Sequence, residues 1–151
     1  MAVVNNIQGK YQEAIDIFVK MMEVAEELGD RKSTAQIYGN IGLSHMFMKE
    51  YESAITHFNT QIAISSKMND NYSLIVSNNN ISYTYVLSGD YEKAVEHALK
   101  SIRINDKVGI PESRAQACDN LGLAYIQLGE FDNAEKYYKE AIDIFNEVGN
   151  K

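Results

Sequence analysis

A short phrase returns every 40 residues along this chain, and this repetition restricts the possible fold more than any other feature. Each copy places an aromatic residue three positions before an alanine: Tyr11 and Ala14, Tyr51 and Ala54, Tyr91 and Ala94, Phe131 and Ala134. A fixed period of this kind indicates a repeat array, in which stacked copies of one small unit bury a continuous core. Such arrays form extended binding surfaces more often than active sites.

The residues between these phrases predict helices. Apolar side chains fall at helical spacing, as at Ala14, Phe18, Met21, Ala25 and Leu28, and the alternation typical of strands is scarce. We predict two helices in each full repeat, from about 31 to 49 and from about 51 to 68 in the first. One proline and no low-complexity tract argue against a linker, so we expect a single solenoid over 1–151: a half repeat at 1–30 and full repeats at 31–70, 71–110 and 111–151.

The predicted helix boundaries carry appropriate residues. Asp30 and Asp70 can accept hydrogen bonds from the free amides at the start of the first helix of their repeats. Pro111 occupies the first helical position of its repeat, where a missing amide hydrogen costs nothing. Glycine or asparagine stands where each second helix ends, and either residue adopts a left-handed turn readily: Gly29, Asn69, Gly109 and Gly149.

Charge and composition exclude several classes of partner. The chain has 14 basic and 21 acidic residues, a net charge of −7 and a pI near 4.9, which disfavours nucleic acid and an acidic membrane surface. No apolar run approaches the roughly 20 residues that span a bilayer, and the amino terminus lacks signal-peptide features. We therefore expect a soluble, cytoplasmic protein. The single cysteine, Cys118, is expected to be a small packed residue.

The motifs resemble the tetratricopeptide repeat, which places Leu-Gly-x-x-Tyr in its first helix and Ala-x-x-x-Phe in its second. The best match is Leu121-Gly122-x-x-Tyr125 with Ala134-x-x-x-Tyr138. This resemblance covers the whole chain and implies an all-α, right-handed α-solenoid of antiparallel helix pairs, with about three and a half repeats. The period of 40 residues in place of 34 implies longer helices, similar to those of Pins-like spindle adaptors, kinesin light chains and peptide-binding bacterial signalling proteins.

The resemblance also implies a concave groove, lined by the first helices, that binds a peptide or helical segment of a partner protein. In long-period members an asparagine often holds the ligand backbone, and Asn40, Asn80 and Asn120 match that position. Neighbouring candidates for the peptide-binding set are polar or apolar residues within about one turn: Gln36, Asn79, Gln116, Asp119, Leu43, Tyr83 and Leu123. An alternative is that the amides cap helices or bridge between them.

Two features narrow the expected ligand. A groove that captures a carboxylate terminus needs paired lysine and arginine, but the corresponding positions hold Gly39, Asn79, Gln116 and Asn120. Asp119 makes the surface slightly acidic and favours a ligand with a nearby Lys or Arg.

The amino end suggests a second mode of association. Residues 1 to 9 are too few to supply a first helix for the half repeat, so we expect the helix over 11–28 to have one uncovered apolar flank. The candidate self-association residues are Ile15, Phe18, Val19 and Met22. At the other end Glu135 and Lys139 replace apolar flank residues, which predicts a solvent-facing surface there.

No catalytic or metal-binding pattern is present in the sequence. The chain lacks a glycine-rich phosphate loop and a nucleophile elbow. His57 and His97 occupy equivalent positions, but zinc usually needs three or four ligands, and Ile17 and Tyr137 supply none. His45 falls at the family's aromatic packing position. We expect no enzyme activity, metal or cofactor. Two alternatives to groove binding stay open: a self-associating scaffold, and a peptide-sensing domain of a bacterial regulator.

Overall fold

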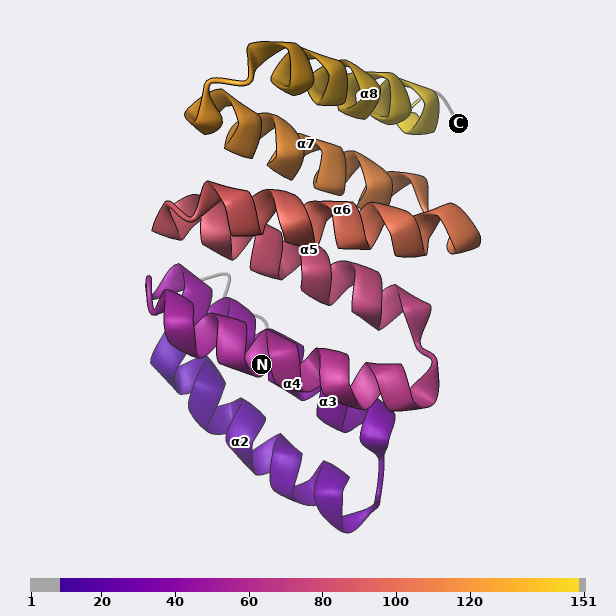
Figure 1. Ribbon diagram of the computed structural model, residues 1–151. Coiled ribbons are helices and arrows are strands. Elements are labelled where there is room, and N and C mark those ends of the chain that lie inside the picture. The colour runs from indigo at the N-terminus through magenta and orange to yellow at the C-terminus, as the bar shows by residue number, and fades with distance from the viewer. Residues whose placement is uncertain (1–8, 150–151) are drawn as a thin grey trace. The chain divides into compact units, whose positions relative to one another are not determined.

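The computed structural model describes residues 9–149, which form seven helices and no strand (Figure 1). The helices are α2 (Tyr11–Glu27), α3 (Arg31–Phe47), α4 (Tyr51–Met68), α5 (Asn71–Ser88), α6 (Tyr91–Val108), α7 (Pro111–Leu128) and α8 (Phe131–Gly149). The prediction of an all-helical chain with two helices per repeat is therefore confirmed. Helix α3 ends two residues earlier than predicted, because Lys49 adopts a left-handed conformation with φ of 63°.

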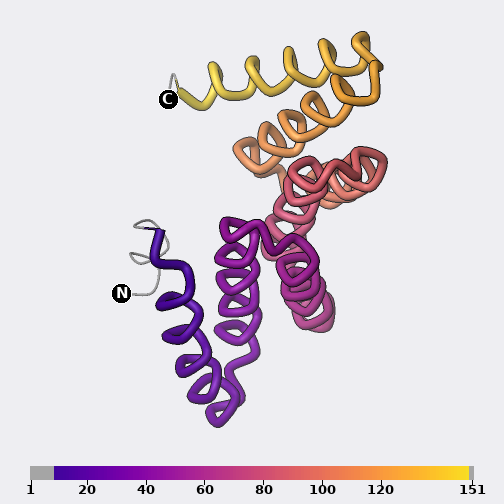
Figure 2. The backbone as a smooth tube through the Cα atoms, turned by 90° about the vertical axis from the view of Figure 1, so that its left-hand side faces the viewer, coloured from indigo at the N-terminus to yellow at the C-terminus, as the bar shows by residue number. Residues whose placement is uncertain are grey.

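The chain divides into two compact units. Unit 1 spans Met1–Ser73 and contains α2, α3 and α4, whereas unit 2 spans Leu74–Lys151 and contains most of α5 with α6, α7 and α8. Within unit 1, α3 packs against both α2 and α4, and consecutive helices run antiparallel (Figure 2). Within unit 2, α7 packs against both α6 and α8. The repeat boundaries within the predicted solenoid stay a prediction from the sequence.

Most helix ends follow the predicted chemistry. Gly29, Asn69 and Gly109 adopt positive φ as predicted, but Gly149 lies within α8 and does not. The Asp30 carboxylate accepts a hydrogen bond from the Ser33 amide at 3.1 Å, and Asp70 accepts from the Ser73 amide at the same distance. Each serine hydroxyl also donates to its aspartate, at 2.6 and 2.7 Å. These bonds satisfy backbone amides that would otherwise lack a partner at a helix start. Pro111 is the first residue of α7, as predicted.

Each unit has its own apolar core. The core of unit 1 consists of side chains from α2 and α3: Ala14, Ile15, Phe18, Ala25, Ile37 and Ile41. The core of unit 2 draws on α6, α7 and α8: Ala98, Ile102, Ala117, Cys118, Leu121 and Ala141. Alanine is frequent in both, so the helices can approach closely.

Glycine permits the closest approaches within the helix pairs. A Cβ atom added to Gly42 would lie 2.7 Å from the Phe58 ring, and one added to Gly122 would lie 2.7 Å from the Tyr138 ring. Real Cβ atoms do not tolerate such contacts, so an aromatic ring in the second helix requires glycine opposite it. The repeat between them holds Ser82 and Ala98 at these positions, which exchanges a large residue for a small one.

Candidate functional site

The predicted peptide-binding residues fall into two separate groups. Gln36, Asn40 and Leu43 lie on α3 in unit 1, where Gln36 is exposed and the other two are half-buried. The remaining predicted residues lie on α5 and α7 in unit 2: Asn79, Asn80, Tyr83, Gln116, Asp119, Asn120 and Leu123. Unit 2 therefore holds most of the candidate site.

Two asparagine side chains tie α5 to α7. Asn79 is fully buried, and its Nδ2 donates to the backbone oxygen of Ser113 at 2.9 Å. Asn120 is 3% exposed, and its Nδ2 donates to the backbone oxygen of Asn79 at 3.0 Å. Both side-chain amides therefore bridge between helices, which was the alternative to peptide binding. To act as peptide anchors they would have to leave a buried site and break these bonds.

The other predicted residues of unit 2, together with neighbours at helical spacing on α5 and α7, make up a set of side chains that we call the α5/α7 face. On α5 this face consists of Val76, Asn80, Tyr83 and Leu87, spaced at four, three and four residues. On α7 it consists of Gln116, Asp119, Leu123 and Ile126, spaced at three, four and three residues. The exposed fractions are 37% for Tyr83 and 42% for both Leu87 and Ile126.

Three residues of this face were missed by the sequence interpretation. Val76, Leu87 and Ile126 continue the helical stripes that Asn80 and Leu123 begin, so the spacing alone would have identified them. The structure shows that apolar side chains account for much of the exposed surface of this face.

Asp119 is the acidic residue of the α5/α7 face. Its side chain is exposed, but partial burial still raises the pKa of the carboxyl above its ordinary value. The charge of Asp119 also acts on α8: the pKa of Tyr138 is raised, first by burial and then by this carboxylate. The surroundings of Asp119 in the folded protein therefore disfavour its ionised form.

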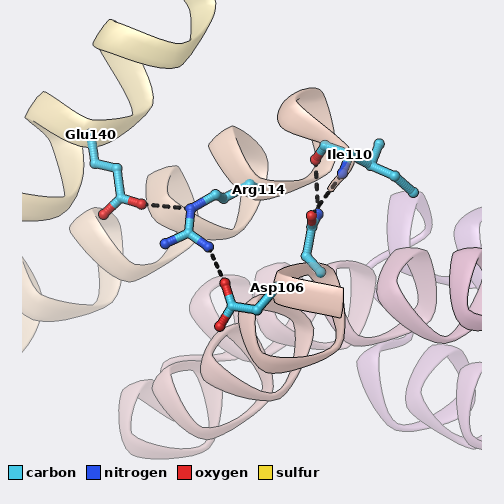
Figure 3. Close-up of polar contacts among 5 residues, drawn as sticks. Asp106, Ile110, Arg114 and Glu140 are labelled. Carbon is cyan, nitrogen blue, oxygen red and sulfur yellow. Dashed lines mark hydrogen bonds and ion pairs between the residues drawn. The ribbon is translucent and has the colours of Figure 1, made fainter. Parts of the chain in front are cut away.

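Polar contacts also hold α6, α7 and α8 together. Arg114 donates from Nε to Glu140 at 2.7 Å and from Nη1 to Asp106 at 2.5 Å (Figure 3). Burial opposes the charge of Arg114, but these two carboxylates raise its pKa. Asn105 binds both backbone groups of Ile110, accepting from N and donating to O, each at 2.8 Å. These contacts stabilise the connection from which α7 starts.

Cys118 lies in the core of unit 2. Its side chain is fully buried, and burial raises its pKa to about 12, so the thiol stays protonated at neutral pH. Its predicted role as a packed residue is confirmed.

The candidate self-association residues on α2 differ in exposure. Ile15 and Phe18 are 8% and 2% exposed and pack against Ile37 and Ile41 in the core of unit 1, so neither is available for self-association. Met22 is half-buried against the same core, and Val19 is 47% exposed. The prediction could not separate these faces, because the packing of α2 on α3 decides which of two apolar stripes is covered.

A different part of α2 is open. Met21, Val24 and Leu28 are 48%, 55% and 76% exposed. They line an open groove of about 400 Å³ between α2 and α3, together with Ile17, Lys20, Ala25, Asp30, Ser33 and Ile37. At the other end of the chain, Glu135 and Lys139 form the predicted ion pair, yet Ile142 and Phe145 on α8 are also more than half exposed. The solvent-facing prediction thus holds for only part of α8.

Within residues 9–149, no group of three or more His, Cys, Asp or Glu side chains could hold a metal ion. No helix in the same range is long and apolar enough to cross a membrane.

These helix pairs, with a polar and apolar face and no converging reactive groups among the described residues, define a helical-repeat protein. The chain belongs to the tetratricopeptide repeat family, whose model matches residues 1–67, 33–107 and 73–147. No curated protein shows significant sequence similarity to it.

Solved structures with the same fold are known. Aspartyl phosphate phosphatase F from Bacillus subtilis has a TM-score of 0.93 at 19% identity, covering 99% of this chain and 39% of that protein. BtubC from P. vanneervenii has a TM-score of 0.86 at 18% identity, covering 99% and 62%. A Rap protein complexed with competence and sporulation factor has a TM-score of 0.83 at 20% identity, covering 97% and 41%. This chain thus spans less than two thirds of each neighbour.

These neighbours confirm the predicted tetratricopeptide-like solenoid class, and the family match confirms the resemblance seen in the sequence. The repeats and the neighbouring folds support a protein–protein interaction module.

Proposed function

We propose that this protein binds an amphipathic helical segment of a partner protein on the α5/α7 face. The observation that carries this proposal concerns two kinds of side chain on the same two helices. The apolar side chains are exposed, whereas the amides are buried and already hydrogen-bonded to the backbone. Tyr83, Leu87 and Ile126 are each more than one third exposed, whereas Asn79 and Asn120 are buried and bonded to backbone oxygens.

Because these amides are already hydrogen-bonded within the protein, a helical ligand is favoured over an extended peptide. An extended segment needs partners for its own backbone groups, whereas a helix satisfies them internally and binds through its apolar side chains. Asn80 is half-exposed and can still contact a ligand, but it is a single amide. The apolar side chains of Tyr83, Leu87, Leu123 and Ile126 offer a surface for ligand residues at helical spacing.

The polar residues of the face suggest the charge of the ligand. Asp119 is exposed on α7 beside the apolar residues, and Gln116 is exposed one turn before it. A lysine or arginine next to the ligand's apolar face would pair with Asp119 and would offset its unfavourable charge. We therefore infer a preference for helices with a basic flank.

A displayed library of random 20-residue peptides, selected on the full chain, tests this proposal. We expect enriched sequences with apolar residues at helical spacing and an adjacent Lys or Arg. Their binding should weaken at least tenfold in the Tyr83→Ala/Leu123→Ala variant, because truncating two apolar contacts removes about 1–3 kcal/mol or more. The matched control is Ile142→Ala, which removes an exposed apolar side chain on α8.

Equal binding of the selected peptides to the wild type and to the double variant would exclude the α5/α7 face. Peptides with alternating apolar residues would exclude a helical ligand. Asn120→Ala is unsuitable as a binding test, because loss of its buried bond to Asn79 would disturb the fold itself.

The groove between α2 and α3 favours a second candidate function, self-association. Met21, Val24 and Leu28 expose a contiguous apolar surface on α2, and the groove beside them has room for inserted side chains. We propose that two copies meet through this groove, so that the chain also serves as an assembly unit.

Light scattering across micromolar concentrations tests this second candidate. We expect a dimer that the Met21→Glu/Val24→Glu variant converts to a monomer, while the control Gln12→Glu, exposed on the same helix, leaves it unchanged. A wild type that stays monomeric at several hundred micromolar would remove self-association. Phe18→Asp is not a valid test, since Phe18 lies in the core.

A peptide-sensing role in a bacterial regulator is the remaining alternative. The structural similarity to a Rap protein complexed with competence and sporulation factor supports it at the level of the fold. That role would depend on the same α5/α7 face.

A further inference from the structure

Four side chains form a column in the α3–α4 pair of unit 1, which we call the His45–His57 column. The imidazole rings of His45 and His57 stack with centroids 5.1 Å apart and planes within 3°. The ring of Tyr38 stacks on His57 at 6.0 Å. At the other end, Nδ1 of His45 lies 2.6 Å from Oε2 of Glu50.

The same seam occurs twice in unit 2 with different chemistry. Positions 45 and 57 become Tyr85 and His97 in one repeat and Tyr125 and Tyr137 in the next, and both pairs have centroids 5.7 Å apart. His97 has a neutral hydrogen-bond partner, since its Nδ1 lies 3.0 Å from Oδ1 of Asn78. Two facing imidazoles occur at this seam only in the α3–α4 pair of the three described pairs.

A second positive charge in the column would lie close to the first. Glu50 accepts a hydrogen bond from His45, and its carboxylate can balance an imidazolium there. A second proton would make His57 a cation too. Its ring centroid lies 5.1 Å from that of His45, and the ring is partly shielded from water. Like charges at this separation repel strongly in a partly buried site.

Two ring contacts and one hydrogen bond define the groups that act on His57. From α3 they are Tyr38 and His45, and Glu50 in the α3–α4 connection reaches the column through His45. The tyrosine face would attract an imidazolium weakly. Burial and the charge of His45 outweigh this attraction, because they lower the pKa of His57 below the ordinary value of 6.5.

We propose that the His45–His57 column makes unit 1 responsive to protons, so that mild acidification loosens the packing of α3 against α4. The unfolded chain binds a proton at His57 as the pH falls below 6.5, while the folded unit resists that proton. Stability that is fully present above pH 6.5 is thus lost as the pH falls through the lowered pKa of His57. Such an element would change the exposed surface of α3, including Gln36, between neutral and acidic conditions.

Chemical unfolding of the full chain at about pH 7 and about pH 5 tests the proposal. The variant His45→Tyr/His57→Tyr copies the Tyr125–Tyr137 seam, which also has a glutamate, Glu130, at the position of Glu50. We expect the unfolding equilibrium constant to rise several-fold more on acidification in the wild type than in the variant. His97, whose pKa is lowered by burial and by Lys100 against the opposing effect of Glu96, is present in both and contributes equally. Equal pH dependence in the two proteins would overturn the proposal.

A second measurement does not depend on how well the double variant folds. The His45→Tyr variant copies the Tyr85–His97 seam of unit 2, and the ring protons of His57 can be followed by NMR in both proteins. We expect the titration midpoint of His57 to move to higher pH in the variant, because the neighbouring cation is gone. An unchanged midpoint would show that the two imidazoles are not coupled and would overturn the proposal.

Discussion

At the scale of single residues, the size of one side chain sets the size of its partner across a helix pair. Gly42 faces Phe58, and Gly122 faces Tyr138, with no space for a methyl group between them. Gly39 likewise leaves room for Gln61, whereas the next repeats combine Asn79 with Ser101 and Asp119 with Ala141 at the same positions. A substitution at one of these positions must therefore be judged together with the residue opposite it.

Gly42→Ala should lower the free energy of unfolding by about 1–3 kcal/mol, because the added Cβ overlaps the Phe58 ring. In the background Phe58→Ala the same substitution should cost much less, since the ring that it strikes is absent. Urea unfolding of the four proteins measures this coupling. Gly149→Ala is the control, as its Cβ would meet no atom within 4 Å. Additive effects of the two substitutions would contradict the proposed clash.

Asp119→Asn should leave the stability at pH 7 unchanged or slightly higher. Because the folded state raises the pKa of Asp119, the ionised carboxylate is less favourable in the folded than in the unfolded chain. The wild type therefore regains stability as the pH falls through the raised pKa, and its difference from the variant disappears below about 3.8. Urea unfolding at several pH values measures this trend. A clear loss of stability in the variant at pH 7 would instead indicate a stabilising partner for the carboxylate.

At the scale of secondary-structure elements, local chemistry positions the helices and long-range contacts join them. The N-caps Asp30 and Asp70 and the first-turn Pro111 act within one helical turn, so they could be identified from sequence. The contacts that close the α6–α7 connection were not identified. Asn105 is equivalent to Ala25 and Ser65, and nothing in its spacing showed that it would bind both backbone groups of Ile110.

Asn105→Ala should reduce the free energy of unfolding by about 1–3 kcal/mol, because it leaves a partly buried amide and carbonyl of Ile110 without their partner. Arg114→Met should cost about 1 kcal/mol or less, since its ion pairs with Asp106 and Glu140 are partly exposed. Thermal and urea unfolding rank the two variants. A larger effect at Arg114 would mean that the ion pairs, and not the asparagine, hold this connection.

At the scale of the whole molecule, the net charge restricts which partner molecules can bind. The family match extends over three overlapping segments, and the net charge is −7. The resulting negative potential repels polyanions and attracts basic segments. This agrees with the preference for a basic flank that Asp119 suggests for the ligand.

The protein should not bind duplex DNA at micromolar concentrations, even in about 50 mM salt, where phosphate contacts are strongest. An electrophoretic mobility assay checks this expectation, with a basic protein of similar size as the positive control. A salt-sensitive shift would reveal a basic surface that the net charge conceals.

The burial of individual residues in the candidate sites could not be predicted from their positions in the repeat. Asn80 and Asn120 hold equivalent positions in their repeats, yet Asn80 is half-exposed and Asn120 is buried against Asn79. Ile15 and Val19 are neighbours on one helix, but only Ile15 is covered by α3. Equivalent positions receive different surroundings because each depends on the residues of the adjoining helix.

The sequence by itself determined the helices, most of their ends and the repeat family, because those properties follow from spacing and from bonds within one turn. The tertiary structure alone decided which side of α2 is open, which amides are used up in joining α5 to α7, and which two imidazoles meet. Those outcomes depend on side chains brought together from different helices, and a periodic pattern does not specify how such neighbours share space, hydrogen bonds and charge.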